Sequence, residues 1–97
     1  MNRKRVTNLY SGDVQGIGFR YTVKKLAMSF EVVGTVCNLS DGQVGLVAES
    51  TKEELEAFLA AIRASDVGRF IRQEQIHWSA TQNDFRGFEI THARDTE

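Results

Sequence analysis

The sequence predicts an α+β fold in which five strands form one antiparallel sheet and two helices cover one of its faces. Segments with alternating apolar residues, typical of half-buried strands, are separated by two segments whose apolar residues recur every three to four positions. Their order along the chain is strand, helix, strand, strand, helix, strand, followed by a short last strand. A chain of 97 residues is expected to form a single domain over 1–97, with its core between about 5 and 92.

The first half of the chain contains three of the strands and one helix. The expected elements are strands over residues 5–11, 32–39 and 43–49 and a helix over 19–30. The helix is indicated by apolar residues on one face of a 3.6-residue period, namely Phe19, Val23, Leu26, Ala27 and Phe30. β-Branched residues favour the strand over 32–39. The turn Ser40-Asp41-Gly42 predicts that this strand and the next form a hairpin.

The second half begins with a capped helix. Ser50 or Thr51 can cap it, and a glutamate three residues later, Glu53 or Glu54, completes a capping-box pattern. Its apolar stripe consists of Leu55, Phe58, Leu59 and Ile62. The segment Ser65-Asp66-Val67-Gly68 is expected to end this helix, with Gly68 as its stop. The remaining expected segments are a strand over 70–80, a polar loop over 81–87 and a strand over 88–92.

The element order determines the topology. Each strand-helix-strand half requires a right-handed crossover, and the simplest closed arrangement is the ferredoxin-like split βαβ fold. In it the strands over 5–11 and 32–39 run parallel, with the strand over 43–49 between them. Their carboxyl ends therefore lie at the same edge of the sheet, two strand spacings or roughly 10 Å apart.

Composition excludes several classes of partner. The net charge is −1, from 12 basic and 13 acidic residues, which provides no electrostatic basis for binding nucleic acid or an acidic membrane surface. No secretory or membrane-spanning apolar run is present. Cys37 is the single cysteine, so no intramolecular disulfide can form, and a reducing, cytoplasmic setting fits. We expect a monomer.

A glycine-rich loop joins the first strand to the first helix. It reads Gly12-Asp13-Val14-Gln15-Gly16-Ile17-Gly18-Phe19-Arg20. Glycines let the backbone bend and present its N–H groups, and a helix start adds unpaired donors and the positive end of the dipole, which together predict an anion site. Arg20 adds a planar fork suited to phosphate. A cation in the first helical turn opposes the dipole at a cost of roughly 0.3–1 kcal/mol, and such a broken local rule often marks a functional site.

Asn38 is a second candidate, at the end of the strand over 32–39. If Val36 faces the helix-covered core, Asn38 faces the same way and points toward the glycine loop. Its amide both donates and accepts hydrogen bonds, so it can hold and orient a water molecule. The alternative is that Asn38 begins an Asx turn into the following hairpin.

The two segments together resemble the acylphosphatase family. That family's first motif, Gly-x-Val-Gln-Gly-Val-x-Phe-Arg, is matched by residues 12–20, with Ile17 in place of valine. Its second motif, Gly-x-Val-x-Asn followed by a turn, is matched by residues 34–38 and the turn Ser40-Asp41-Gly42. The spacing between the motifs and the order of elements also match. The resemblance covers about residues 5–92.

The resemblance implies hydrolysis of the carboxyl–phosphate bond of a small-molecule acyl phosphate to a carboxylate and inorganic phosphate. By position, Arg20 binds the phosphate and Asn38 places the attacking water. The implied cradle, which would also take inorganic phosphate or another anion, consists of the backbone N–H groups of Gln15, Gly16, Ile17, Gly18, Phe19 and Arg20. No metal ligand and no cofactor is expected.

Some positions depart from the family pattern, and an alternative function stays open. Asp13 places a negative charge beside the anion loop, while Thr35, Ser50 and Thr91 stand where an aromatic residue, glycine and arginine are common. The alternative is a non-catalytic anion-binding or regulatory domain on the same fold, with Asp13 as the residue that would weaken catalysis. An RNA-recognition module is disfavoured, because residues 43–49 lack aromatic side chains.

Overall fold

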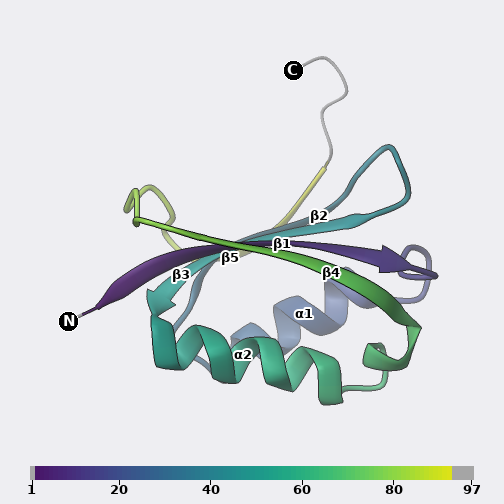
Figure 1. Cartoon of the computed structure of the whole chain (residues 1–97), viewed down its shortest axis with the longest axis horizontal. Helices are drawn as coiled ribbons and strands as arrows, with labels where there is room; N and C mark the ends of the chain where they lie inside the picture. Colours follow the sequence, from purple (N-terminus) through teal and green to yellow (C-terminus); the bar gives the residue numbers. More distant parts are fainter. Residues whose placement is uncertain (1, 93–97) are drawn as a thin grey trace.

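The computed structural model describes residues 2–92 and has two layers, a five-stranded sheet and a pair of helices against one face of it (Figure 1). The elements are β1 (Arg3–Gly12), α1 (Phe19–Ala27), β2 (Val33–Asn38), β3 (Val44–Thr51), α2 (Lys52–Ala64), the short 3₁₀ helix η1 (Gly68–Phe70), β4 (Ile71–Ser79) and β5 (Phe88–His92). The strand order is β4-β1-β3-β2-β5. The ferredoxin-like topology is therefore confirmed, with β3 between the parallel strands β1 and β2.

One part of the fold prediction is wrong, because the sheet is mixed rather than wholly antiparallel. β1 pairs antiparallel with β3 and β4, and β2 pairs antiparallel with β3, but β2 and β5 run parallel. The loop after β4 crosses the sheet before β5 begins beside the start of β2, where the Gly34 N–H donates to the Gly87 carbonyl oxygen. Apolar alternation reports which face a residue occupies and carries no information about strand direction.

The end of α1 differs from the prediction. The helix stops at Ala27, and the next three residues donate to carbonyls three positions back, ending with Phe30 to Ala27 at 3.2 Å. Phe30 still packs on Phe58, with ring centroids 5.6 Å apart. The apolar periodicity includes Phe30 because it indicates which residues are buried, whatever their backbone hydrogen bonds. The tighter turn after Ala27 keeps Phe30 on the core face.

Both ends of α2 lie where they were predicted, but the residue that stops the helix differs. Thr51 is the N-cap, and its hydroxyl accepts from the Glu54 N–H at 3.2 Å. The C-cap is Ser65, and Gly68 opens η1 instead of stopping α2. A Cβ at Gly68 would collide with the backbone of Arg63, so close approach of the backbones explains the glycine.

The core lies between the sheet and the helices and fixes both ends of the glycine loop. Tyr10 of β1 packs against Phe19 of α1, with ring centroids 5.0 Å apart, and Val14 within the loop is fully buried. The core therefore holds the loop at its start through Tyr10, in its middle through Val14 and at its end through Phe19. Among residues 2–92, no helix is long and apolar enough to cross a membrane.

Candidate active site

The loop between β1 and α1 forms the candidate site. Gly16 and Gly18 have φ angles of 80° and 83°, a left-handed conformation that glycine adopts without strain. Gly18 is the N-cap of α1, and within residues 2–92 no side chain forms a capping hydrogen bond there. The first N–H groups of α1 are therefore available to a ligand, at the positive end of the helix dipole.

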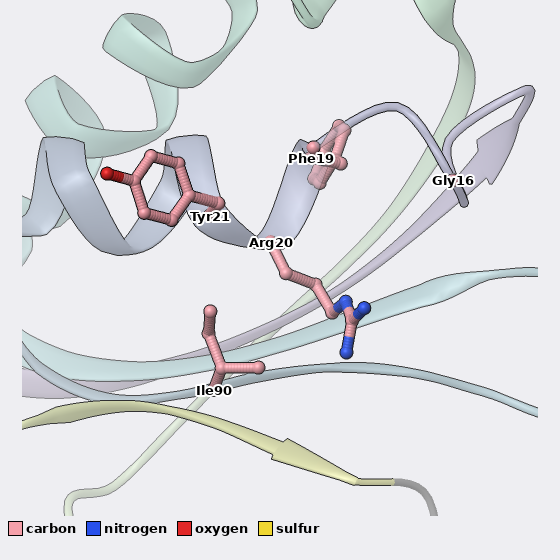
Figure 2. A pocket seen from close by; sticks show the side chains of 6 residues that line it. Gly16, Phe19, Arg20, Tyr21 and Ile90 are labelled. Carbon is pink, nitrogen blue, oxygen red and sulfur yellow. The ribbon is translucent and has the colours of Figure 1, made fainter.

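A pocket of about 160 Å³ opens at this helix start. Its lining consists of Gly16, Gly18, Phe19, Arg20, Tyr21 and Ile90 (Figure 2). The volume is below the roughly 300–1,000 Å³ typical of sites for drug-sized ligands, and it suits a small anion. Four of the six residues predicted to cradle an anion thus line one pocket.

Arg20 is half-buried, and its side chain leaves α1 toward the sheet (Figure 2). Within the described part of the chain, no carboxylate forms an ion pair with it. The first turn of α1 also contains no acidic residue. The guanidinium and the helix start therefore present positive charge to the same space.

Asp13, the residue that raised the alternative function, lies outside the pocket lining. Its carboxylate is 3.6 Å from the Arg72 guanidinium, and both side chains are nearly four-fifths exposed. Solvent exposure and the neighbouring Arg72 guanidinium both weaken the electrostatic effect of Asp13 on the anion site.

Gln15 has a role that the sequence reasoning missed. Its Nε2 donates to the Leu39 carbonyl oxygen at 2.8 Å and to the Gln43 carbonyl oxygen at 2.9 Å. These bonds tie the glycine loop to the turn between β2 and β3. The sequence does show an amide side chain in a loop that is otherwise largely apolar or glycine, which could have indicated a structural hydrogen bond. The backbone groups that this side chain reaches depend on the tertiary fold.

Asn38 ends β2 on the face predicted for it. Its strand neighbour Val36 is fully buried and pairs with Ile90, which lines the pocket. Asn38 itself is not in the lining, although it lies two residues along the same face. Its Oδ1 is buried and has no hydrogen-bond partner among residues 2–92.

The Asx-turn interpretation of Asn38 is therefore wrong. That turn would use the Asn38 Oδ1 as an acceptor, and this atom has no partner. Asp41 performs the equivalent function, since its Oδ1 accepts from the Gln43 N–H at 3.0 Å.

The structure brings together some predicted residues and adds others. Gln15 and Ile17 do not line the pocket, and Ile17 instead packs against the core. Tyr21 and Ile90 line it without having been predicted. Ile90 reaches the site because β5 lies beside β2, which no local pattern indicates.

The other chemically capable side chains of residues 2–92 form no metal centre. His77 and His92 are both exposed. Within residues 2–92, no group of three or more histidine, cysteine, aspartate or glutamate side chains could hold a metal ion.

Comparison with known proteins identifies the family. The acylphosphatase family model matches residues 6–90. An acylphosphatase of Listeria welshimeri is 40% identical over 83 residues, which cover 84% of this chain and 89% of that protein. One of Salinibacter ruber is 34% identical over 87 residues, covering 90% and 92%.

A solved structure agrees with the sequence matches. The crystal structure of acylphosphatase from Bacillus subtilis superposes with a TM-score of 0.81 at 28% identity, covering 91% of this chain and 98% of that one. Family model, relatives and fold coincide over nearly the whole chain. The chain therefore belongs to the acylphosphatase family, and its activity is the hydrolysis of acyl phosphates.

Proposed function

We propose that this acylphosphatase binds the phosphoryl group of its substrate at the start of α1 and positions the attacking water with Asn38. The observation that carries this proposal is that the start of α1, which has no side-chain cap among residues 2–92, and the Arg20 side chain line the same pocket. The cradle consists of the backbone N–H groups of Gln15, Gly16, Ile17, Gly18, Phe19 and Arg20.

Arg20 has two functions in this proposal. Its planar guanidinium donates to two phosphate oxygens at once, which orients the phosphoryl group. It also stabilises charge on the equatorial oxygens as the transition state forms, together with the backbone donors. Its half-burial and the absence of a competing carboxylate among residues 2–92 support both functions.

Asn38 is suited to holding water. A buried amide oxygen without a protein partner is costly unless a water or ligand satisfies it, by about 1–3 kcal/mol. A water donating to this Oδ1 directs a lone pair away from Asn38. That orientation leaves the water oxygen able to attack phosphorus.

The chemistry requires no further side chain. The water oxygen attacks phosphorus, the bond between phosphorus and the anhydride oxygen breaks, and the electron pair leaves with the carboxylate. A carboxylate is stable near neutral pH, so its departure needs no general acid. The proton of the water passes to an oxygen of the phosphate product.

Hydrolysis of benzoyl phosphate tests the proposal. The assay, run with EDTA and no added metal, compares wild type with Arg20→Ala and Asn38→Ala. Arg86→Ala, an exposed arginine in the loop before β5, is the matched control. We expect turnover in wild type and control and a loss of about 10²–10³-fold in kcat for both site variants.

The same assay separates the alternatives. Near-normal turnover in either site variant with a native unfolding midpoint would remove that residue from its role. A wild type that binds inorganic phosphate and turns nothing over would instead indicate an anion-binding domain.

We further propose that the protein acts as a cytoplasmic monomer, with no cofactor, nucleic-acid or membrane partner. Its single cysteine suits a reducing compartment, and its net charge of −1 provides no attraction for polyanions. Light scattering on the purified protein tests the monomer: a dimer mass would contradict it.

A further inference from the structure

A second hollow continues from the anion pocket along the exposed side of α1. It has a volume of about 300 Å³ and is lined by Tyr21, Lys24, Lys25, Met28 and Ile90. Tyr21 and Ile90 belong to both hollows. A ligand held at the helix start can therefore extend into the second hollow without leaving the surface. We call this second hollow the Tyr21–Met28 groove.

The groove contains two large apolar side chains that the core leaves exposed. Tyr21 is 67% exposed and Met28 is 82% exposed. Both lie on a different face of the helix from the buried residues of α1. Tyr21, Lys24, Lys25 and Met28 follow at i, i+3, i+4 and i+7, so they form one continuous stripe. Large exposed apolar side chains grouped beside a polar site are typical of ligand grooves.

The topology directs the groove away from Asn38. α1 runs from the carboxyl end of β1 back toward the start of β2, so the path from Tyr21 to Met28 leads away from the sheet edge where Asn38 lies. In phosphoryl transfer the attacking and leaving oxygens lie on opposite sides of phosphorus. A water held by Asn38 therefore requires the leaving carboxylate on the side away from Asn38, which is the side of the groove.

We infer that the Tyr21–Met28 groove is the subsite for the acyl group, and that it favours acyl phosphates with an aromatic or bulky apolar acyl group. This inference rests on the proposed function. Tyr21 supplies a ring face for stacking, and Ile90 and Met28 supply further apolar surface in the same groove. An acetyl group has a single methyl beyond its carbonyl carbon, so it offers far less apolar surface to the groove than a benzoyl group does. The groove thus discriminates between substrates that share the same phosphate.

The test compares benzoyl phosphate with acetyl phosphate in wild type, Tyr21→Ala and Met28→Ala. We expect the benzoyl-to-acetyl ratio of kcat/KM to fall roughly tenfold in Tyr21→Ala and less in Met28→Ala. Tyr21→Phe keeps the ring and should keep the ratio. Ile76→Ala, which removes an exposed apolar side chain from β4 at the opposite sheet edge, is the matched control and should also keep it.

Inhibition by inorganic phosphate distinguishes a subsite from a disturbed loop. The inhibition constant should stay within about twofold of wild type in Met28→Ala, Tyr21→Phe and Ile76→Ala. In Tyr21→Ala, whose side chain also lines the anion pocket, it should change much less than the substrate ratio. An unchanged substrate ratio in Tyr21→Ala, or an equal loss for both substrates with weakened phosphate binding, would overturn the subsite and leave the proposed function intact. No turnover of either substrate by wild type would overturn both.

Discussion

At the residue scale, the site depends on functional groups that the fold leaves without protein partners. The N–H groups at the start of α1 lack a side-chain cap, and the Asn38 Oδ1 lacks a partner, both within residues 2–92. Unsatisfied polar groups are destabilising unless a ligand or water binds them. Arg20 adds a cation at a helix end where cations are unfavourable. The fold therefore loses stability at these positions, and the anion and water of the proposed function would offset that loss.

Replacement of Arg20 by lysine tests whether the planar guanidinium group is needed or a positive charge is sufficient. Lysine keeps the charge but cannot donate to two phosphate oxygens in one plane. We expect Arg20→Lys to lose about 2–4 kcal/mol of transition-state stabilisation, similar to the loss of one oxyanion donor. The measurement is kcat/KM for benzoyl phosphate, with Arg86→Lys as the matched control. Turnover equal to wild type would show that charge alone is sufficient.

The pH dependence of the maximal rate tests whether the two side chains act alone. Neither an arginine nor an amide titrates between about pH 5 and 8, so kcat should be nearly flat over that range. His92 is the nearest titratable group by strand register, since it pairs with Asn38 across β2 and β5. A bell-shaped profile that His92→Gln flattens would assign an acid–base role to that histidine.

At the element scale, the site is a junction between a strand-helix loop and a hairpin turn. Gln15 joins them through two hydrogen bonds to backbone carbonyls, and the Gln43 side chain adds a third link, since its Nε2 donates to the Ser11 hydroxyl at 2.8 Å. Asn38 lies immediately before this turn. The distance between the anion cradle and Asn38 is therefore controlled by groups that take no part in the chemistry.

Removal of the Gln15 side chain should weaken both stability and catalysis. Gln15→Ala removes one of two donors from each of the Leu39 and Gln43 carbonyl oxygens, which keep their backbone donors, and we expect the loss of these two hydrogen bonds to cost about 1–3 kcal/mol in the free energy of unfolding. It should lower kcat more than it raises the inhibition constant of inorganic phosphate, because the cradle remains and its relation to Asn38 is loosened. Gln75→Ala, an exposed glutamine of β4, is the control. Equal effects on phosphate binding and kcat would contradict this interpretation.

At the scale of the whole molecule, the loop after β4 is secured across the open face of the sheet by a buried carboxylate. Glu49 is fully buried, and its carboxylate accepts from Arg5 Nε at 2.7 Å and from the N–H groups of Gln82 and Asn83 at 2.9 and 3.2 Å. Arg5 also reaches Asp84 at 2.8 Å. Burial opposes ionisation of Glu49, but these hydrogen bonds outweigh it and hold the pKa of the carboxyl below its ordinary value.

The lowered pKa of Glu49 predicts a loss of stability in acid. A carboxyl whose folded pKa is depressed stabilises the fold above its unfolded pKa, about 4.3, and this contribution is lost as pH falls through the folded pKa. Glu49→Gln should destabilise the protein by about 3 kcal/mol at pH 7 and reduce the difference in stability between pH 7 and pH 3. Glu89→Gln, an exposed carboxylate on β5, is the control.

Urea unfolding of both variants at pH 7 and pH 3 provides the measurement. Glu74, whose pKa is also lowered by hydrogen bonds from Arg63 and Asn8 that outweigh burial, leaves a residual acid dependence in both variants. An identical pH dependence in Glu49→Gln and wild type would show that Glu49 contributes nothing to acid sensitivity.

Most of the fold follows from local patterns, and so do the positions of the two candidate side chains, Arg20 and Asn38. Thr51 capped its helix as predicted, and the strand phase placed Asn38 on the core side with Val36. The errors have a common cause. Each error concerns backbone geometry that side-chain periodicity does not report. α1 ends where Phe30 donates to the carbonyl oxygen three residues back, Gly68 lies against the backbone of Arg63, and the direction of β5 depends on its pairing with the distant β2.

The sequence alone determined the order of elements, the glycine loop, Arg20 and Asn38, because helix and strand periods, glycine conformation and side-chain chemistry are local properties. Only the tertiary structure decided that Gln15 bonds to Leu39 and Gln43, that Asp13 is screened by Arg72, and that Ile90 of β5 lines the pocket. These facts depend on how strands pair and which backbone groups then face one another. Such long-range relations arise from packing the whole chain, and no short segment contains them.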